Sequence, residues 1–223
     1  MPCFIVFVLL FFHECGHFLM ACLFGFDVDR IYFYPWGGIS KFTTKLNVSI
    51  FQEFIVLIAG PIFQVVVYYI LVRISFFSSY LSLIKNINFS LLIFNMLPIY
   101  PLDGGRLLNL MLNCFLSFKK SFFISIYFSF LVIVLFFCFN LNNIGINLIF
   151  IVCFLFYKIL DEKSKFLFYM DKFLLERYLY SFKFRRLKRV NGVDGFYKGC
   201  RHLVYNGNRY LSEKEFLLKK FKK

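Results

Sequence analysis

The chain alternates between long apolar stretches and shorter segments that carry most of its polar residues. A helix needs about 20 residues to cross a bilayer, and five stretches are long enough to be considered as spans. They cover residues 2–24, 54–77, 87–113, 122–139 and 144–160. The last two are short and are joined by Asn140–Asn143, so they predict a tight helical hairpin.

The polar segment at 27–50 does not have a helical pattern. Residues 31–34 and 39–44 flank Pro35–Gly38 and are typical of two short strands about a turn. We expect a membrane-associated β-hairpin here. Its edge could receive an extended substrate as an added strand, although an ordinary interfacial loop explains these residues equally well.

Beyond residue 160 the chain becomes amphipathic. Strands are expected at 200–205 and 209–211, because the Asn-Gly between them suits a type I′ turn. Ser212, followed by Glu213 and Glu215, predicts the N-cap and first turn of a last helix.

Composition supports the membrane interpretation. Hydrophobic residues make up 60% of the 223 residues and charged residues 17%, with 36 Phe. A soluble domain usually carries about 25% charged residues, so a soluble enzyme is excluded, as are a disordered chain and a secreted disulfide scaffold. None of the seven cysteines forms a C-x-x-C pair, which indicates reduced thiols. The fold class is therefore an all-α polytopic membrane protein with about five transmembrane helices.

Charge is distributed unevenly and predicts topology. Residues 1–160 hold 9 Lys/Arg and 5 Asp/Glu, whereas residues 161–223 hold 17 and 7. Because Lys and Arg are retained on the cytoplasmic side, we expect a cytoplasmic C-terminus, an outside Met1 and a multi-pass protein of the cell membrane. We divide the chain into a transmembrane core, 1–160, and a small basic cytoplasmic tail, 161–223. No motif for direct nucleic-acid binding accompanies the basic residues.

The first apolar stretch contains the motif His13-Glu14-Cys15-Gly16-His17, an H-E-x-x-H pattern. Two histidines four residues apart lie on one helix face and can bind one Zn²⁺ ion, while Glu14 can take a proton from a metal-bound water. Structural histidines or a chance polar cluster are the alternative. A carboxylate at membrane depth is costly, which favours the metal site. The stretch lacks a basic start and a cleavage site, so it is not a signal peptide.

A second polar insertion, Asn95–Arg106, offers a third ligand. Its two prolines cannot sit in a regular helix, and broken helix at membrane depth is tolerated where it is buried or lines a wet cavity. Asp103 directly follows this break, and a carboxylate oxygen would complete a catalytic zinc site of three protein ligands. Asp103 taken alone reads better as a helix N-cap; together with H-E-x-x-H, the ligand interpretation is favoured.

H-E-x-x-H in one span and N-x-x-P-x-x-P-L-D-G-G in a later one resemble the site-2 protease family of intramembrane zinc metalloproteases, of the peptidase M50 type. The chain is most similar to the sporulation branch of that family, on the residues Pro35–Gly38, Glu53 through Ala59–Pro61, Asn95–Arg106 and Phe173–Tyr178. The resemblance implies that His13, His17 and Asp103 bind zinc and that Glu14 is the base. It also implies that Asn95 positions the substrate or the developing oxyanion.

The resemblance also implies a membrane-associated pro-sigma-type substrate and inhibitory membrane proteins. The family usually has a further span before H-E-x-x-H, whereas 12 residues precede His13 here; that span is dispensable or the start is late. The sporulation branch ends in a CBS domain, and from about residue 190 this chain has room for a partial remnant, so nucleotide binding is not inferred. His202 is expected to be an ordinary surface or core histidine.

Three classes of function follow. The favoured one is a zinc metalloendopeptidase that hydrolyses a peptide bond in or near the membrane. An inactive pseudoprotease that binds clients as an adaptor is the alternative. A transporter would also place polar residues at mid-membrane, but repeated halves are then expected and none is visible.

Contacts with membrane lipid are expected, and an oligomer is compatible with the sequence. We interpret Gly60-Pro61 as a small residue and a kink that allow close helix packing. We interpret Glu53 as a carboxylate at the membrane interface that needs no special role.

Overall fold

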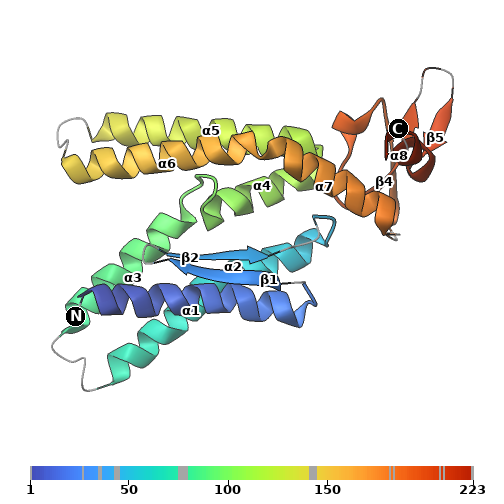
Figure 1. Cartoon of the computed structure of the whole chain (residues 1–223). Helices are drawn as coiled ribbons and strands as arrows, with labels where there is room; N and C mark the ends of the chain where they lie inside the picture. Colours follow the sequence, from blue (N-terminus) through green and yellow to red (C-terminus); the bar gives the residue numbers. More distant parts are fainter. Residues whose placement is uncertain are drawn as a thin grey trace. The chain divides into compact units, whose positions relative to one another are not determined.

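The computed structural model covers the whole chain, and its described residues are 2–26, 28–34, 37–42, 46–74, 80–140, 145–180, 182, 184–205, 207 and 209–221. The chain forms two compact units (Figure 1). One comprises Met1–Lys45 with Phe51–Leu97, and the other comprises Leu46–Ile50 with Pro98–Lys223.

The first unit contains three apolar helices, α1 (Pro2–Leu23), α2 (Ile50–Arg73) and α3 (Leu81–Met96). The buried residues of α1 follow one another at three or four positions, apart from the adjacent pair Gly16 and His17, which gives this otherwise apolar helix one inward stripe. The stripe packs into a core formed by Ile5, Leu9, Val67 and Ile84. The stripe also carries the two histidines of the sequence motif.

The same unit contains the predicted β-hairpin, in which β1 (Val28–Tyr34) pairs antiparallel with β2 (Gly37–Phe42). The pairing closes at Tyr34 opposite Gly37, and β2 lies beside α1 (Figure 1). Both predicted strands are confirmed, although they extend further toward the N-terminus than expected. The predicted turn residues Pro35 and Trp36 lie outside the described residues.

The second unit contains the helices α4 (Asp103–Phe115), α5 (Phe118–Phe139), α6 (Ile146–Ser164) and α7 (Phe166–Leu179). Helices α5 and α6 run side by side (Figure 1), as the predicted helical hairpin requires. Most of the predicted connection, residues 141–143, lies outside the described residues. The predicted span at 87–113 is two helices, because the chain leaves helical geometry after Met96 and resumes it at Asp103.

The tail of this unit forms a three-stranded sheet in the order β3-β4-β5, from β3 (Arg186–Val190), β4 (Cys200–Tyr205) and β5 (Tyr210–Ser212). A 3-10 turn, η3 (Val193–Gly195), precedes β4, and α8 (Glu213–Phe221) packs on β4 and β5. The antiparallel β4–β5 pair confirms the predicted strands, whereas Asn206 and Asn208 of the predicted turn lie outside the described residues. Strand β3, parallel to β4, was not predicted.

The start of α8 confirms the predicted cap. The Glu215 N–H donates to Ser212 Oγ at 3.4 Å, and the Ser212 N–H donates to Glu215 Oε2 at 3.1 Å. This reciprocal pair is a capping box, which satisfies two backbone donors that the helix itself cannot satisfy.

Within the largely apolar core of the tail, a buried polar network centres on Arg177, a residue of α7. Its guanidinium donates to the carbonyl oxygens of Cys200 and Tyr197, to Glu213 at 2.8 Å and to Asn47 Oδ1 at 2.6 Å. Asn47 in turn donates from Nδ2 to the Phe173 carbonyl oxygen. The buried cation is therefore paired and multiply hydrogen-bonded, as a buried charge must be. The Arg177 side chain thereby connects Asn47 with Glu213, which are far apart in the sequence.

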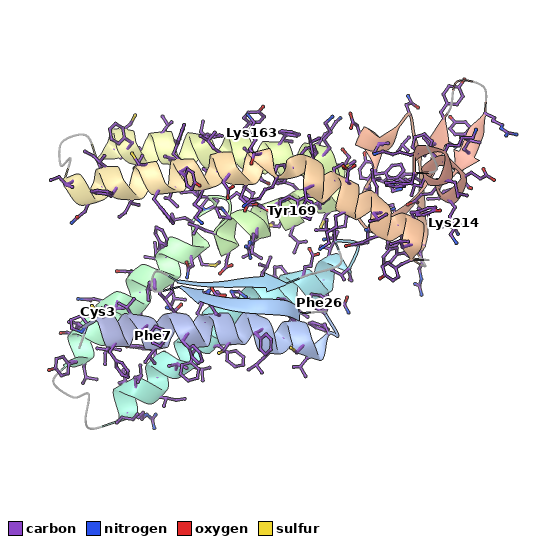
Figure 2. The ribbon with its side chains drawn as sticks, in the orientation of Figure 1. Cys3, Phe7, Phe26, Lys163, Tyr169 and Lys214 are labelled. Carbon is purple, nitrogen blue, oxygen red and sulfur yellow. The ribbon has the colours of Figure 1, made fainter. Side chains whose placement is uncertain are left out.

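Among the described residues, three helices are long and apolar enough to cross a membrane, namely α1, α2 and α5; α3 is a shorter apolar helix. Their outward faces are apolar as well. The Phe7 side chain on α1 points away from the core and is 53% exposed (Figure 2), and Ile62 on α2 and Leu131 on α5 are exposed too. Outward apolar side chains suit contact with lipid. The chain is thus a mostly helical membrane protein, and five spans stay a prediction.

Candidate metal centre

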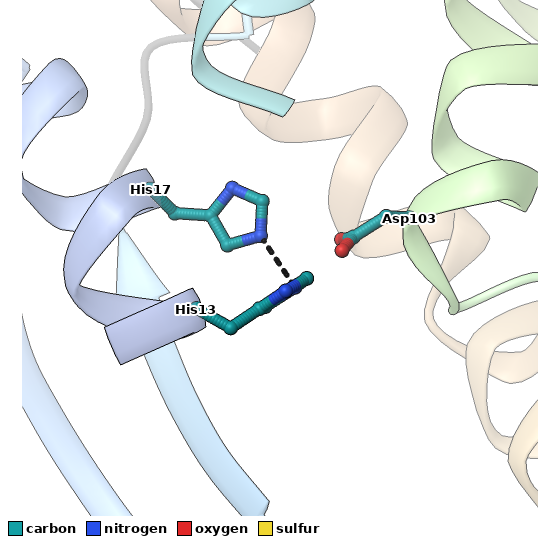
Figure 3. A group of neighbouring side chains, drawn as sticks. All are labelled: His13, His17 and Asp103. Atoms are coloured by element: carbon teal, nitrogen blue, oxygen red, sulfur yellow. Dashed lines mark hydrogen bonds between the residues drawn. The ribbon is translucent and has the colours of Figure 1, made fainter. Parts of the chain in front are cut away.

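Helix α1 places His13 and His17 one turn apart on its buried stripe, as the H-E-x-x-H spacing predicts. The two side chains are 1% and 6% exposed. Their ring centroids are 4.8 Å apart, and the two Nε2 atoms face each other at 3.2 Å (Figure 3). The two imidazoles therefore present one nitrogen each to a common point.

Hydrogen bonds at the opposite ring nitrogens fix the tautomer of both histidines. His17 Nδ1 lies 2.8 Å from the Val56 carbonyl oxygen, which can only accept. His13 Nδ1 lies 2.9 Å from Gln64 Oε1. The amide orientation of Gln64 is set by Asn88, because Gln64 Nε2 donates to its Oδ1 and backbone oxygen at 3.0 and 3.2 Å. Both histidines therefore carry their proton on Nδ1.

In a neutral ring that carries its proton on Nδ1, Nε2 is the nitrogen that can bind a metal. The two Nε2 atoms lie 3.2 Å apart, so one cation beside them could bind both. Imidazole nitrogen is a preferred zinc ligand, and the partner on the second nitrogen is the usual device for orienting a metal-binding histidine. The donor set thus fits a metal ion such as Zn²⁺.

Two glycines permit this arrangement. A Cβ at Gly60 of α2 would lie 2.2 Å from His17 Nε2, and a Cβ at Gly16 of α1 would lie 2.6 Å from the Ala59 carbonyl oxygen. Any larger side chain at either position would push the helices apart or displace the ring. The close-packing interpretation of Gly60 is confirmed, and the packing partner is a predicted metal ligand.

Asp103 is the first residue of α4, directly after the non-helical segment Leu97–Leu102. The N-cap position belongs to Leu102, so the alternative role of Asp103 as N-cap is not the one observed. A Cβ at Gly105 would lie 2.4 Å from the Ile99 carbonyl carbon, which explains the glycine in the first turn. One ligand atom each of His13, His17 and Asp103 forms a group within 4.8 Å (Figure 3).

The other two predicted site residues lie on the first unit's helices. Glu14 follows His13 on α1 and is half-buried, and Asn95 is half-buried in the last turn of α3. Glu14 is not one of the three described residues grouped as candidate metal ligands. The roles of Glu14 and Asn95 stay predictions.

Sequence reasoning did not single out Gln64 and Asn88. Both are buried polar residues in apolar helices, α2 and α3. A buried amide in an apolar helix is costly unless it is hydrogen-bonded, so an isolated Gln in the stretch 54–77 was a usable signal. Its partner could not be read from the sequence, because 51 residues separate Gln64 from His13.

Apolar helices of membrane-spanning length that carry a buried, oriented histidine pair define a membrane protein with a candidate metal centre as the class of protein. A family model described as "Peptidase family M50" matches residues 2–81 and 73–139. The chain belongs to this family, that of the site-2 proteases.

Individual relatives agree with the family. The chain is similar to "Stage IV sporulation protein FB" of Bacillus subtilis (strain 168), with 32% identity over 91% of this chain and 75% of the relative. It is 30% identical to a zinc metalloprotease of Methanocaldococcus jannaschii, over 52% of this chain and 37% of the relative. The solved "Site-2 Protease from Methanocaldococcus jannaschii" matches with a TM-score of 0.57 and 25% identity, over 71% of this chain and 76% of that chain.

Proposed function

We propose that this protein is a zinc-dependent intramembrane protease that hydrolyses a peptide bond in or near the bilayer. The observation that carries the proposal is the histidine pair of α1. The two Nε2 atoms face one point, where each could offer its electron pair to a metal. Each Nδ1 atom donates a hydrogen bond to an oxygen that fixes the orientation of the ring. This geometry prepares two ligands for a metal before the metal binds.

His13, His17 and Asp103 would hold the ion, an N₂O set that leaves a coordination position open. A zinc ion held by these residues would lower the pKa of a bound water and polarise a carbonyl group. Glu14, next to the first ligand, would accept the proton of the attacking water and return it to the leaving amine. Asn95 would donate an amide hydrogen bond to the developing oxyanion or to the substrate backbone.

The proposed substrate class rests on the similarity to a sporulation protein and on the β1–β2 hairpin. The similarity to a sporulation protein supports a membrane-associated pro-sigma-type substrate, and inhibitory membrane proteins as partners. Hydrolysis needs an extended peptide, and the β1–β2 hairpin of the first unit offers strand edges to which such a peptide could add. The basic tail supports a multi-pass topology of about five spans with a cytoplasmic C-terminus.

The first experiment is co-expression with a membrane-tethered pro-sigma-type substrate, comparing the native chain with Glu14→Gln on a gel. A shorter product that disappears with Glu14→Gln is expected, while zinc content stays unchanged because Glu14 is not a ligand. Zinc binding without cleavage by either chain, also after an upstream in-frame extension and with several substrates, would favour the pseudoprotease adaptor. Absence of zinc from the native chain would refute the proposed site.

A further inference from the structure

The tail sheet has one covered and one open face. Side chains alternate between the two faces along a strand. On β4, Cys200, His202 and Val204 are buried, and α8 packs over this face with Leu217 fully buried. The alternate positions form the open face, which we call the outer sheet face: Leu187, Arg189, Arg201, Leu203, Tyr205, Tyr210 and Ser212.

The outer sheet face is amphipathic in composition. Leu187, Tyr205 and Tyr210 are 58%, 42% and 49% exposed. Arg201 lies beside Leu187 in the strand register, and both arginines of the face are exposed. The two tyrosine rings lie 5.3 Å apart, and the Arg189 guanidinium lies 5.6 Å from the Tyr210 ring centroid. Aromatic rings, aliphatic side chains and cations thus share one surface.

This combination is the one found at membrane–water interfaces. Tyrosine rings sit at the level of lipid headgroups, aliphatic side chains enter the acyl boundary, and Lys and Arg are attracted by anionic lipid. Residues 161–223, which include the sheet, hold 17 Lys/Arg and 7 Asp/Glu. The chain also carries its own membrane-spanning helices, so the tail is never far from a bilayer.

We propose that the outer sheet face rests on the surface of an anionic lipid bilayer, with Arg189 and Arg201 at the lipid phosphates. The lipid contact orients the tail sheet parallel to the membrane. It needs the chain to be in a membrane, but it requires neither zinc nor proteolysis.

The test uses the full chain in vesicles and one tryptophan reporter. Trp36→Phe removes the single native tryptophan, and Tyr210→Trp places a reporter on the outer sheet face. Lys214→Trp, at an exposed position of α8, is the matched reporter on the covered side of the sheet. The vesicles contain brominated phosphatidylcholine, which quenches indole on contact, with or without an equal share of phosphatidylglycerol.

We expect quenching of the Tyr210→Trp reporter in anionic vesicles, release of that quenching by high salt, and little quenching of the Lys214→Trp reporter. A basic residue near an anionic surface contributes about 1 kcal/mol, or about fivefold. Arg189→Gln with Arg201→Gln therefore lowers the ratio of docked to undocked tails about 30-fold. Lys214→Gln with Lys219→Gln, which removes the same charge from α8, leaves the ratio nearly unchanged.

Several results would overturn the proposal. They are equal quenching of both reporters, equal quenching in neutral and anionic vesicles, and equal effects of the two double variants. Shielding of the Tyr210→Trp reporter that depends on the ratio of protein to lipid would assign the face to a second copy. The side chains of Arg189, Arg201, Tyr210, Lys214 and Lys219 are exposed, so unchanged circular dichroism serves as the folding control for these variants.

Discussion

Gln64→Met is expected to weaken zinc binding although it leaves every proposed ligand in place. Gln64 is fully buried, and its Oε1 accepts from His13 Nδ1 at 2.9 Å. Methionine fills a similar volume but supplies no comparable acceptor. The Nδ1 proton of His13 then loses this partner, or the proton moves to Nε2, where it blocks the nitrogen that faces His17.

The expected loss of zinc affinity in Gln64→Met follows from these two possible outcomes for the His13 proton. Leaving a buried donor without its acceptor costs about 1–3 kcal/mol. That range corresponds to a rise in the zinc dissociation constant of about 5-fold to 150-fold. Mutation of an outer partner of a metal-binding histidine typically costs 10–100-fold, which falls inside this range. If the proton moves to Nε2 instead, that nitrogen can bind zinc only after losing the proton again, which also raises the zinc dissociation constant.

The assay is competition for zinc between the detergent-solubilised chain and a chromophoric chelator. Ser125→Ala is the matched control, because Ser125 is a buried polar residue of a membrane helix that donates to its own helix at Ser121. We expect its zinc affinity to equal that of the native chain. A Gln64→Met chain that binds zinc within about twofold of the native chain would refute the argument that this amide orients His13.

Three further predictions concern packing and the tail. Gly60→Ala places a methyl group 2.2 Å from His17 Nε2 and should abolish tight zinc binding in the same assay, whereas Gly145→Ala, in open space, should not. Arg177→Leu leaves its buried acceptors unpaired and should destabilise the tail by about 3–5 kcal/mol, measured as lost hydrogen-exchange protection. Burial lowers the pKa of His202, so its protonation favours the unfolded tail; denaturant resistance should be full above about pH 6.5 and fall as the pH drops through that value.

Each of these has an outcome that would contradict it. Zinc binding by Gly60→Ala at native strength would mean that the helices separate at little cost. Arg201→Leu, an exposed arginine of β4, should change exchange protection by less than about 0.5 kcal/mol, and an equal loss in both variants would discount the Arg177 network. A tail whose denaturant midpoint is the same at pH about 8 and about 5.5 would show that His202 does not control its acid stability.

Local signals in the sequence predicted much of the fold. Apolar runs located α1, α2, α5 and α6, but they merged α3 and α4 into one span and did not predict α7. Alternation and turn residues located the strands of the first hairpin and the β4–β5 pair, and Ser212 with Glu215 located the last helix. Strand β3 was missed, because Arg186–Val190 is dominated by cations and reads as a polar segment. Its partner strand is parallel, and a parallel pairing leaves no hairpin turn to recognise.

The candidate metal centre was likewise predictable from the sequence only in part. The spacing of His13 and His17 is a local property of one helix, so the motif predicted their common face. The tautomer of each ring depends on acceptors from another helix, Val56 and Gln64, which no periodicity relates to the motif. Orientation of the two histidines is therefore a property of the packing of α1 against α2. This is why Gly60, which has no side chain to carry chemistry, still constrains the candidate metal centre: a Cβ there would lie 2.2 Å from His17 Nε2.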